Sequence, residues 1–438
     1  MVDAWLPYGK TDVCARIPAR NYLGSIEPKE RKGVPDAKME VERSLREPIG
    51  KPKISEFVRP ESRVAIVVDD ETRLTPTSIM IHPLLAELNS AGVKDDNVTI
   101  IFACGTHRPM TREETVRVLG EDVVNRIKTA SHDCKAEDLV FVGTTEKHGN
   151  RILLNRIFAQ ADLKILTGDV CFHYYAGYGG GRKSVLPGVA GEESIKYNHA
   201  MLLNANASTG VLEGNPVHED MVEAAALAKV DFALNVVTNS KGEIVKALAG
   251  EVRQVFNEGV KLVDEMYRIT VDRRADIVVV SSGGYPADVN LYQAHKAVDS
   301  VSDIVKRGGV IVLVAECSEG HGNQAFYDWM VKFPDAKAAE REIKRNFVLG
   351  GHKAYYLLDA LQRTKIILVS SMPDYYAAGV FRLKTVKGVN EAMSMAFDIA
   401  GSSAKVWTVP FGNFTLPVFK PPETENSSAE DATAKVIN

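Results

Sequence analysis

The sequence lacks the features that mark several broad classes of protein. Its longest apolar runs, such as VIVLVA at 310–315, are far too short to cross a bilayer. The first residues, MVDAWLPYGKTD, contain no charged segment followed by an apolar stretch, as a secretory signal would require. Five cysteines lie far apart without CxxC spacing, which is typical of a reducing cytoplasm and argues against structural zinc. We therefore expect a cytoplasmic protein that does not associate with membranes.

An excess of either charge is also missing. The 53 lysines and arginines and the 57 acidic residues leave a formal net charge of −4, and no basic run occurs. Because nucleic-acid-binding proteins usually carry a basic patch, the composition predicts no nucleic-acid partner. The sequence makes no prediction of the oligomeric state. The end of the chain, 423–438, is polar and poor in apolar residues, so we predict a disordered tail there.

Three common motifs are absent. A phosphate-binding loop reads G-x-x-x-x-G-K-[ST], whereas residues 177–184 read GYGGGRKS and place Arg182 where the second glycine belongs. An arginine side chain would crowd the phosphates at that point, which argues against a nucleoside triphosphatase. A dinucleotide fingerprint, GxGxxG at the opening of a helix, is missing as well. So is the G-x-S-x-G turn of many hydrolases.

Short β-branched runs alternate with helical patterns along the chain. Apolar runs without polar alternation are typical of strands buried on both faces, and strand–helix alternation predicts parallel sheets with crossover helices. We predict an α/β fold of two domains with mainly parallel, Rossmann-like sheets. The predicted strands are 63–68, 98–103, 163–167, 232–238, 276–281, 309–315, 365–370 and 405–409. The predicted helices are 77–91, 111–119, 216–229, 251–268, 289–305, 335–345 and 388–400.

A charged segment, YRITVDRRAD at 267–276, separates a long amphipathic helix from a new strand and predicts a domain boundary. We expect an N-terminal α/β domain at 1–270 that carries a cofactor site and a C-terminal α/β domain at 275–405 that closes over the substrate. Residues 406–422 are a candidate to return to the N-terminal domain. Ligands of open α/β sheets bind beyond the carboxyl ends of the strands, so we predict an active site in the cleft between the domains.

Chemically active side chains follow five of the predicted strands. Each has a simpler interpretation, because a single histidine is more often structural than catalytic, and acidic and basic neighbours often only cap a helix or pair with each other. A tyrosine, a glutamine and a lysine at helical spacing could likewise be a solvated helix face. In chain order, the residues are Asp69, Asp70 and Arg73; His107; His173, Arg182 and Lys183; Tyr292, Gln293 and Lys296; and His321.

The most unusual stretch is HYYAGYGGGRKSVLPGVAG at 173–191. Glycine lets the backbone approach a ligand closely, although the same run could be a plain turn or a phosphate nest. A lysine among the glycines, Lys183, could be a covalent attachment point or a Schiff-base nucleophile. His107, His173 and His199 lie in or beside these loops and could act as bases or as metal ligands. Nitrogen ligation suits nickel, copper, iron or zinc.

Taken together, these residues resemble the nickel-dependent lactate racemase family. The resemblance covers about residues 5–415. It rests on D-x-x-R at 70–73, G-T-H-R at 105–108, the stretch at 173–191, the Asn-His pair at 198–199 and YQAHK at 292–296. It implies a nickel pincer nucleotide, pyridinium-3,5-bisthiocarboxylic acid mononucleotide, attached covalently to Lys183. It also implies His199 as the nickel ligand. Gly179, Gly180, Gly181 and Arg182 would bind the same cofactor.

The resemblance implies a racemase or epimerase that acts on lactate or a related 2-hydroxy acid. Hydride would pass reversibly from the substrate to the cofactor, through a 2-keto acid intermediate. His107 and His173 would be the two bases, and Asp70 would orient one of them. The enzymes that build the cofactor would be partners in maturation. The expected substrate-binding residues are Arg73, Tyr292, Gln293 and Lys296.

Two other functions are compatible with parts of this pattern. A nicotinamide-dependent 2-hydroxy acid oxidoreductase would use similar substrates, but the missing dinucleotide fingerprint argues against it. A non-catalytic protein that binds a hydroxy acid or a nucleotide would not require two bases. The segment GHKAYYLLDA at 351–360 could line the substrate pocket through Tyr355 and Tyr356, but the sequence favours a buried helix there.

Overall fold

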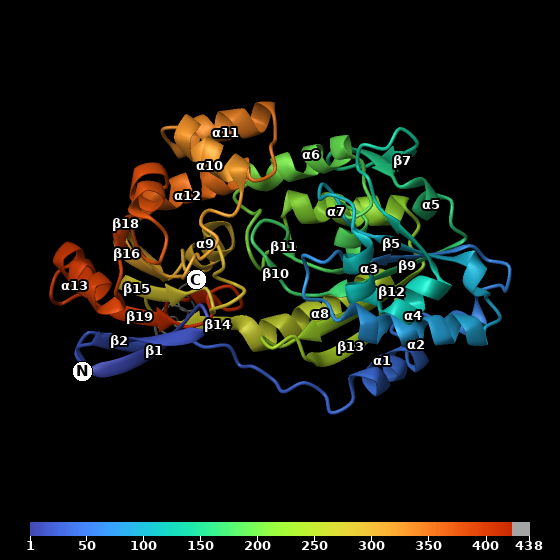
Figure 1. Cartoon of the computed structure of the whole chain (residues 1–438), viewed down its shortest axis with the longest axis horizontal. Coiled ribbons are helices and arrows are strands. Elements are labelled where there is room, and N and C mark those ends of the chain that lie inside the picture. The colour runs from blue at the N-terminus through green and yellow to red at the C-terminus, as the bar shows by residue number, and fades with distance from the viewer. Residues whose placement is uncertain (423–438) are drawn as a thin grey trace, which may run out of the picture. The chain divides into compact units, whose positions relative to one another are not determined.

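The structure is a computed structural model that describes residues 1–422 (Figure 1). Its internal contacts divide the chain into two compact units. The larger unit comprises Pro28–Tyr267 and Asn323–Leu358. The smaller unit comprises Met1–Glu27, Arg268–Gly322 and the chain from Asp359 onward. Both units are α/β with mainly parallel sheets, as the sequence predicts.

This division departs from the predicted boundaries in three segments. Residues 1–27 fold with the smaller unit rather than with the N-terminal domain, and residues 323–358 fold with the larger unit. The segment 406–422 does not return to the larger unit, because its strands β19 (Val406–Val409) and β20 (Leu416–Phe419) pair with strands of the smaller unit. These placements rest on backbone hydrogen bonds between residues distant in sequence, which no local pattern encodes. The predicted disordered tail, 423–438, lies outside the described residues.

A six-stranded sheet forms the centre of the larger unit, in the order β13-β12-β9-β4-β5-β6. Its pairs are parallel except for the antiparallel edge pair β12–β13. All five side chains of β4 are buried, as expected for a strand covered on both faces. The strands are β4 (Val64–Val68), β5 (Val98–Phe102), β6 (Lys128–Ser131), β9 (Leu163–Asp169), β12 (Phe232–Thr238) and β13 (Ile244–Gly250).

Helices cover both faces of this sheet. α1 and α2 pack on the face formed by alternate apolar side chains such as Ile66 and Ile100. On the other face, Val255 of α8 packs against Ala233 and Leu248. The helices of the larger unit are α1 (Ala37–Arg46), α2 (Thr77–Ser90), α3 (Arg112–Leu119), α4 (Glu121–Arg126), α5 (Arg156–Ala159), α6 (Glu192–Ala200), α7 (Pro216–Leu227), α8 (Val252–Tyr267), α10 (Gln324–Lys332), α11 (Ala336–Arg345) and the first part of α12 (Gly351–Arg363).

The order of the strands creates a switch point in the larger unit. The chain runs from β4 to β5 and β6 on one side, and then places β9 and β12 on the other side of β4. Adjacent crossovers diverge at such a point and leave room beyond the carboxyl ends of the strands, where ligands of α/β proteins bind. Two small antiparallel pairs complete the unit: β7 (Val140–Thr144) with β8 (Arg151–Leu154), and β10 (Phe172–His173) with β11 (Gly177–Tyr178).

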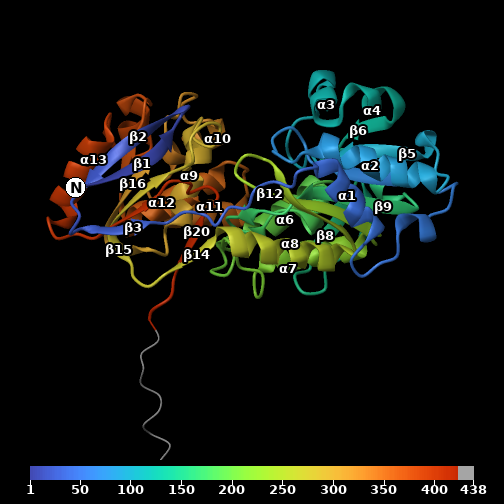
Figure 2. The same cartoon turned by 90° about the horizontal axis from the view of Figure 1, so that it is seen from below.

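The smaller unit has a second six-stranded sheet, in the order β18-β17-β16-β15-β19-β3, with every pair parallel. The β1–β2 hairpin and α13 pack on one face of it (Figures 1 and 2). Its switch point lies between β15 and β19. The elements not yet given are β1 (Val2–Tyr8), β2 (Thr11–Ile17), β3 (Tyr22–Ser25), β14 (Arg268–Val271), β15 (Ala275–Ser281), α9 (Leu291–Ser300), β16 (Val305–Val314), β17 (Lys365–Val369), β18 (Lys384–Val386) and α13 (Val389–Ala400).

Every strand and helix predicted from the sequence is present, with shifts at the ends. The buried helix predicted at 351–360 is α12. Among the elements missed from the sequence are β3 and the β1–β2 hairpin, whose side chains are partly exposed, so that their apolar pattern is weak. The buried edge strand β13 and the helices α1, α6 and α10 were missed as well. In the described part of the chain, no helix combines the length and the apolar character that crossing a membrane requires.

Candidate active site

The predicted site residues of the larger unit gather beyond the carboxyl ends of β4, β5 and β9. Asp70 follows β4, His107 follows β5, and Lys183 lies in the loop that follows β9. A backbone hydrogen bond joins the last two loops, in which the Gly105 N–H donates to the Gly188 carbonyl at 3.0 Å. Within the second loop, the Gly188 N–H donates to the Lys183 carbonyl at 3.0 Å. The switch point therefore assembles residues from three separate stretches of sequence.

Asp70 and His107 form a hydrogen-bonded pair. Nδ1 of His107 lies 2.6 Å from Oδ2 of Asp70, and Thr72 donates its N–H and its hydroxyl to Oδ1 of the same carboxylate. Burial alone would raise the pKa of Asp70, but the hydrogen bonds from His107 and Thr72 outweigh it and lower that pKa. An ionised carboxylate only accepts hydrogen bonds, so Nδ1 of His107 carries a proton and Nε2 of neutral His107 is left as a base.

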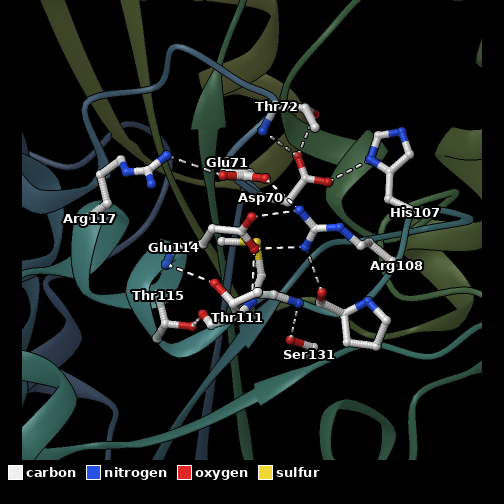
Figure 3. A network of polar contacts seen from close by, with 12 residues as sticks. Asp70, Glu71, Thr72, His107, Arg108, Thr111, Glu114, Thr115, Arg117 and Ser131 are labelled. Atoms are coloured by element: carbon white, nitrogen blue, oxygen red, sulfur yellow. Dashed lines mark hydrogen bonds and ion pairs between the residues drawn. The ribbon is translucent and has the colours of Figure 1, made fainter.

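A network of charged residues next to this pair holds the two loops together (Figure 3). Arg108 donates to Glu71 at 3.1 Å, beside Asp70 in sequence, and makes two hydrogen bonds with Glu114, at 2.8 and 2.5 Å. Glu114 also accepts from the N–H of Thr111, in the capping box that starts α3. The motif residue Arg108 thus ties the His107 loop both to the Asp70 loop and to a helix N-terminus.

The glycine-rich stretch wraps around the Arg182 side chain. The guanidinium donates to the backbone carbonyls of Ala176, Gly179 and Gly180, to Nδ1 of His218, and stacks over Phe256 at 4.1 Å. Burial lowers the pKa of Arg182 to about 9. Because the guanidinium donates to three carbonyls of its own loop, Arg182 stabilises the conformation of that loop. Direct contact of Arg182 with a cofactor stays a prediction.

Gly180 shows why this loop needs glycine. Its φ of +78° is disfavoured for any residue with a side chain, and an added Cβ would lie 2.8 Å from the backbone oxygen of Asp169. Gly181 is also at positive φ, and a Cβ there would press on Phe256 at 3.2 Å. Both positions exclude larger residues because the loop folds closely onto β9 and α8.

Lys183 lies at the end of this loop with its Nζ unpaired: among residues 1–422 no side chain or carbonyl accepts a hydrogen bond from it. Burial lowers the pKa of the Lys183 ammonium well below its usual value, and the positive charges of Arg73 and Arg182 lower it further. A lysine in such surroundings is more readily neutral, which is the state in which an amine forms a covalent bond.

The ring of Tyr175 connects Lys183 with two of the predicted histidines. Nζ of Lys183 lies 5.8 Å from the centre of this ring. The rings of His173 and His199 lie 4.5 and 5.2 Å from it, both edge to face. Tyr175 is 4% exposed, so its ring is buried. The predicted base His173, the predicted attachment point Lys183 and the predicted nickel ligand His199 all lie around this ring. Sequence reasoning quoted this tyrosine but assigned it no role.

His173 has the opposite tautomer from His107. The backbone N–H of Ala176 donates to Nδ1 of His173 at 3.3 Å, and a backbone N–H can only donate. Nδ1 of His173 is therefore unprotonated, which leaves the proton of the neutral ring on Nε2. The ring stacks on Tyr174 at 4.9 Å, and Tyr174 in turn hydrogen-bonds His352 of α12 at 2.6 Å. Residues 323–358, predicted for the other domain, thus support a predicted catalytic residue of the larger unit.

Three further ionisable groups lie on this side of the site. They are Arg73, which is predicted to bind the substrate, and the carboxyl groups of Asp69 and Asp169, for which no role was predicted. Asp69 and Arg73 interact electrostatically, and the charges of Asp69 and Asp70 raise the pKa of Arg73. Burial and the nearby Asp69 raise the pKa of Asp169 to about 8. Arg73 is exposed, so its guanidinium can meet an anion from solvent. Asp69 is among the strand-end residues that the sequence already singles out, whereas Asp169, at the end of β9, was missed although the same signal points to it.

The other predicted substrate residues belong to the smaller unit. Tyr292 and Gln293 lie in the first turn of α9, and Lys296 follows one turn later on the same partly exposed face. The side chain of Asn290 caps this helix by accepting from the Gln293 N–H at 3.0 Å. The three residues follow β15, at the switch point of the second sheet. The predicted interdomain cleft stays a prediction.

No group of three or more His, Cys, Asp or Glu side chains forms a metal site within the described residues. The predicted nickel site takes only one ligand from the protein, His199, so this finding does not test it. Burial and the nearby charge of Lys183 lower the pKa of His199 to about 3. The ring is therefore neutral at physiological pH, as a metal ligand must be.

Comparisons with known proteins agree along the whole folded chain. Residues 8–210 match the lactate racemase N-terminal domain, and residues 270–415 match the lactate racemase C-terminal domain. Two proteins named lactate racemase, from Thermoanaerobacterium thermosaccharolyticum and Lactiplantibacillus plantarum, are each 34% identical over 422 residues. The matches cover 94% of this chain and 98% and 99% of those proteins.

Solved structures show the same relationship. The lactate racemase apoprotein from Thermoanaerobacterium thermosaccharolyticum has a TM-score of 0.89 at 32% identity, over 95% of this chain and 100% of that chain. A Thermotoga maritima protein of known crystal structure has a TM-score of 0.65 at 20% identity, over 89% of this chain and 100% of that chain, and shows the fold alone.

The fold and these matches define an isomerase of the racemase type. The chain belongs to the lactate racemase family. The predicted family, fold class and enzyme class are confirmed.

Proposed function

We propose that this protein racemises lactate or a closely related 2-hydroxy acid with a nickel pincer nucleotide attached to Lys183. The names of its relatives support lactate as the substrate. The observation that carries the mechanism is the arrangement of His173, Lys183 and His199 around the single ring of Tyr175. The expected cytoplasmic location, and maturation by cofactor-building enzymes, stay predictions.

The residues on the larger unit fit this cofactor. Lys183 offers an amine without a hydrogen-bond partner among the described residues and with a lowered pKa, which suits covalent attachment. His199 offers a neutral imidazole, a common ligand for nickel. The Cβ directions of Gly180 and Gly181 point at Asp169 and Phe256, so these glycines serve the fold of the loop, and their contact with the cofactor stays a prediction. When bound, the cofactor supplies an acceptor that takes hydrogen with its electron pair from the substrate α-carbon and returns it.

The two predicted bases differ in tautomer. Nε2 of His107 has a lone pair and is able to accept the proton of the substrate hydroxyl. Nε2 of His173 carries the only proton of the neutral ring. A neutral imidazole that gave this proton away would become an imidazolate, so His173 acts as an acid only after its ring takes up a second proton and Nδ1 releases the Ala176 N–H. A racemase that moves one proton onto one base and takes another from the second requires the second base to be an imidazolium at that point. Asp70 stabilises the imidazolium that forms on His107.

Arg73 is the expected anchor for the substrate carboxylate. It follows β4 three residues after Asp70, it is exposed, and its raised pKa keeps it charged. A guanidinium can hold a carboxylate through two parallel hydrogen bonds, which orients the α-carbon as well as binding the acid. Tyr292, Gln293 and Lys296 are proposed to complete this grip from the smaller unit.

The test is the intact mass of protein produced together with the cofactor-building enzymes and nickel. We expect an adduct on Lys183 in the wild-type protein and none in Lys183→Ala. Lys164→Ala is a suitable control, because Lys164 is also buried but donates to the Ala161 carbonyl, away from the glycine-rich stretch. Active protein with an unmodified Lys183 would refute the mechanism.

A second measurement tests hydride transfer itself. Racemisation of lactate labelled with deuterium at the α-carbon should keep the label in the product, because the hydrogen returns without exchange with water. Solvent hydrogen that enters that position as fast as the configuration inverts would show proton abstraction instead. Net oxidation that depends on added NAD would favour the oxidoreductase alternative.

A further inference from the structure

Asn198 and His199 lie in the last turn of α6 and are both buried. The side-chain nitrogen of Asn198 donates to the Val217 carbonyl at 3.1 Å and to Oδ2 of Asp220 at 2.8 Å. A backbone carbonyl can only accept, so the end of the Asn198 amide that faces Val217 is its NH2 group. The amide oxygen must therefore point the other way.

That oxygen faces His199. Oδ1 of Asn198 lies 3.1 Å from Nδ1 of His199. An amide oxygen only accepts, so Nδ1 of His199 carries the proton. The neutral ring then has its lone pair on Nε2, the nitrogen that remains for a metal.

Asp220 fixes the amide in this orientation. It is fully buried, and its carboxyl oxygens accept from the hydroxyl of Thr145 and the side-chain amide of Asn150, both at 2.8 Å, as well as from Asn198. A buried polar network in which each carboxyl oxygen has a donor is rigid. Thr145 and Asn150, both in the loop between β7 and β8, thus help to hold Asp220 of α7 in place, and Asp220 in turn orients Asn198 of α6.

We propose that Asn198 is a positioning residue that fixes the tautomer of His199 and so presents Nε2 as the nickel ligand, with Asp220 as its anchor. The proposal rests on the proposed function, because it assigns His199 to nickel. Groups that hydrogen-bond the second nitrogen of a metal-binding histidine orient its ring and raise its affinity for the metal. An amide that only joined α6 to α7 would stabilise the protein without selecting a tautomer.

The experiment is long-range ¹H–¹⁵N NMR of the metal-free protein labelled with ¹⁵N-histidine, at neutral pH. The sequence contains ten histidines, and His199→Gln identifies the signals of His199. We expect a protonated Nδ1 and an unprotonated Nε2 on His199 in the wild-type protein. In Asn198→Leu, which keeps the side-chain volume, we expect this preference to be lost. A wild-type His199 with the proton on Nε2, or an unchanged tautomer in Asn198→Leu, would overturn the proposal.

Asn150→Ala is the matched control. It removes another donor to Asp220 but leaves the contact between Asn198 and His199 in place. It should lower the melting temperature without changing the tautomer of His199. If Asn198→Leu does not fold, the wild-type spectrum decides the question alone.

Nickel retention separates this proposal from the proposed function. After maturation and dialysis against a chelator, Asn198→Leu should hold nickel about 10- to 100-fold more weakly than Asn150→Ala. Equal retention in the two variants, with a normal adduct on Lys183, would refute the role of Asn198 and leave the proposed function standing. Absence of the adduct from the wild-type protein would refute the proposed function, while the tautomer of His199 would remain as measured.

Discussion

Asp70 holds His107 through a single short hydrogen bond, 2.6 Å from Oδ2 to Nδ1, between the ends of two neighbouring parallel strands. The carboxylate and the imidazole are 37 residues apart in sequence. The pair meets because β4 and β5 are adjacent and parallel, so that the loops after them leave the same edge of the sheet. This contact defines the tautomer of His107, the predicted base.

Replacing Asp70 by asparagine should reduce racemisation by about 10²-fold or more, because an amide can hold His107 in the wrong tautomer. The turnover number of matured protein should fall more than the Michaelis constant rises. Glu71→Gln is the control, since it changes the neighbouring carboxylate, which contacts Arg108 rather than His107. Equal losses in both variants would contradict the assignment.

His107→Ala and His173→Ala should each lower racemisation by about 10²- to 10⁴-fold, the usual contribution of a general acid or base. Both variants should still form the Lys183 adduct, because neither side chain holds the loop backbone through more than one hydrogen bond. His82→Ala is the control, because His82 bonds Ser78 and Asp122 on the exposed side of α2. Full activity in either single variant would remove that histidine from the mechanism.

Arg182→Lys should destabilise the protein by about 1–3 kcal/mol, because an ammonium cannot reach three carbonyls and a histidine at once. The misfolded loop should also slow formation of the adduct on Lys183. Denaturant unfolding and intact mass measure the two effects. Arg151→Lys, at an exposed arginine, should change neither, and an unaffected Arg182→Lys would show that the loop holds without this guanidinium.

Gly180→Ala should cost more than Gly242→Ala. Both glycines have a φ near +77°, so each substitution costs about 1–2 kcal/mol in backbone strain. Only at Gly180 would the new Cβ also meet a backbone oxygen, that of Asp169 at 2.8 Å, whereas nothing lies within 4 Å at Gly242. Equal free energies of unfolding for the two variants would contradict this account of the loop.

His218 should make stability depend on pH. Burial and the nearby charges of Arg182 and Arg253 lower the pKa of His218 to about 3 in the folded protein. Below pH 6.5 the unfolded chain binds a proton at this residue and the folded protein does not, so the folded state loses stability as the pH falls from 6.5 towards 3. His218→Gln keeps an acceptor for Arg182 and should reduce this slope by up to about 1.4 kcal/mol per pH unit. Identical slopes for both proteins in urea unfolding from pH 7.5 to 5 would refute the prediction.

The amino-acid sequence by itself determined the class of fold and most of the candidate site. Buried strands are continuous β-branched runs, so β4, β5 and β9 are visible without a structure, and ligands of such sheets bind beyond the strand ends. That rule alone points to Asp70, His107 and Lys183. The glycine-rich stretch at 173–191 is recognisable as a candidate ligand site from its composition alone.

Only the tertiary structure decided which residues meet and which proton each histidine carries. The placement of residues 1–27 and 323–358 depends on pairing and packing between distant segments, which local patterns do not contain. The tautomers of His107, His173 and His199 are set by a carboxylate, a backbone N–H and an amide oxygen, respectively. Ala176 and Asn198 lie within three residues of His173 and His199 in sequence. The sequence does not show these contacts, because the Asn198 amide is oriented by its bonds to Val217 and Asp220, and the Ala176 N–H by the fold of the glycine-rich stretch.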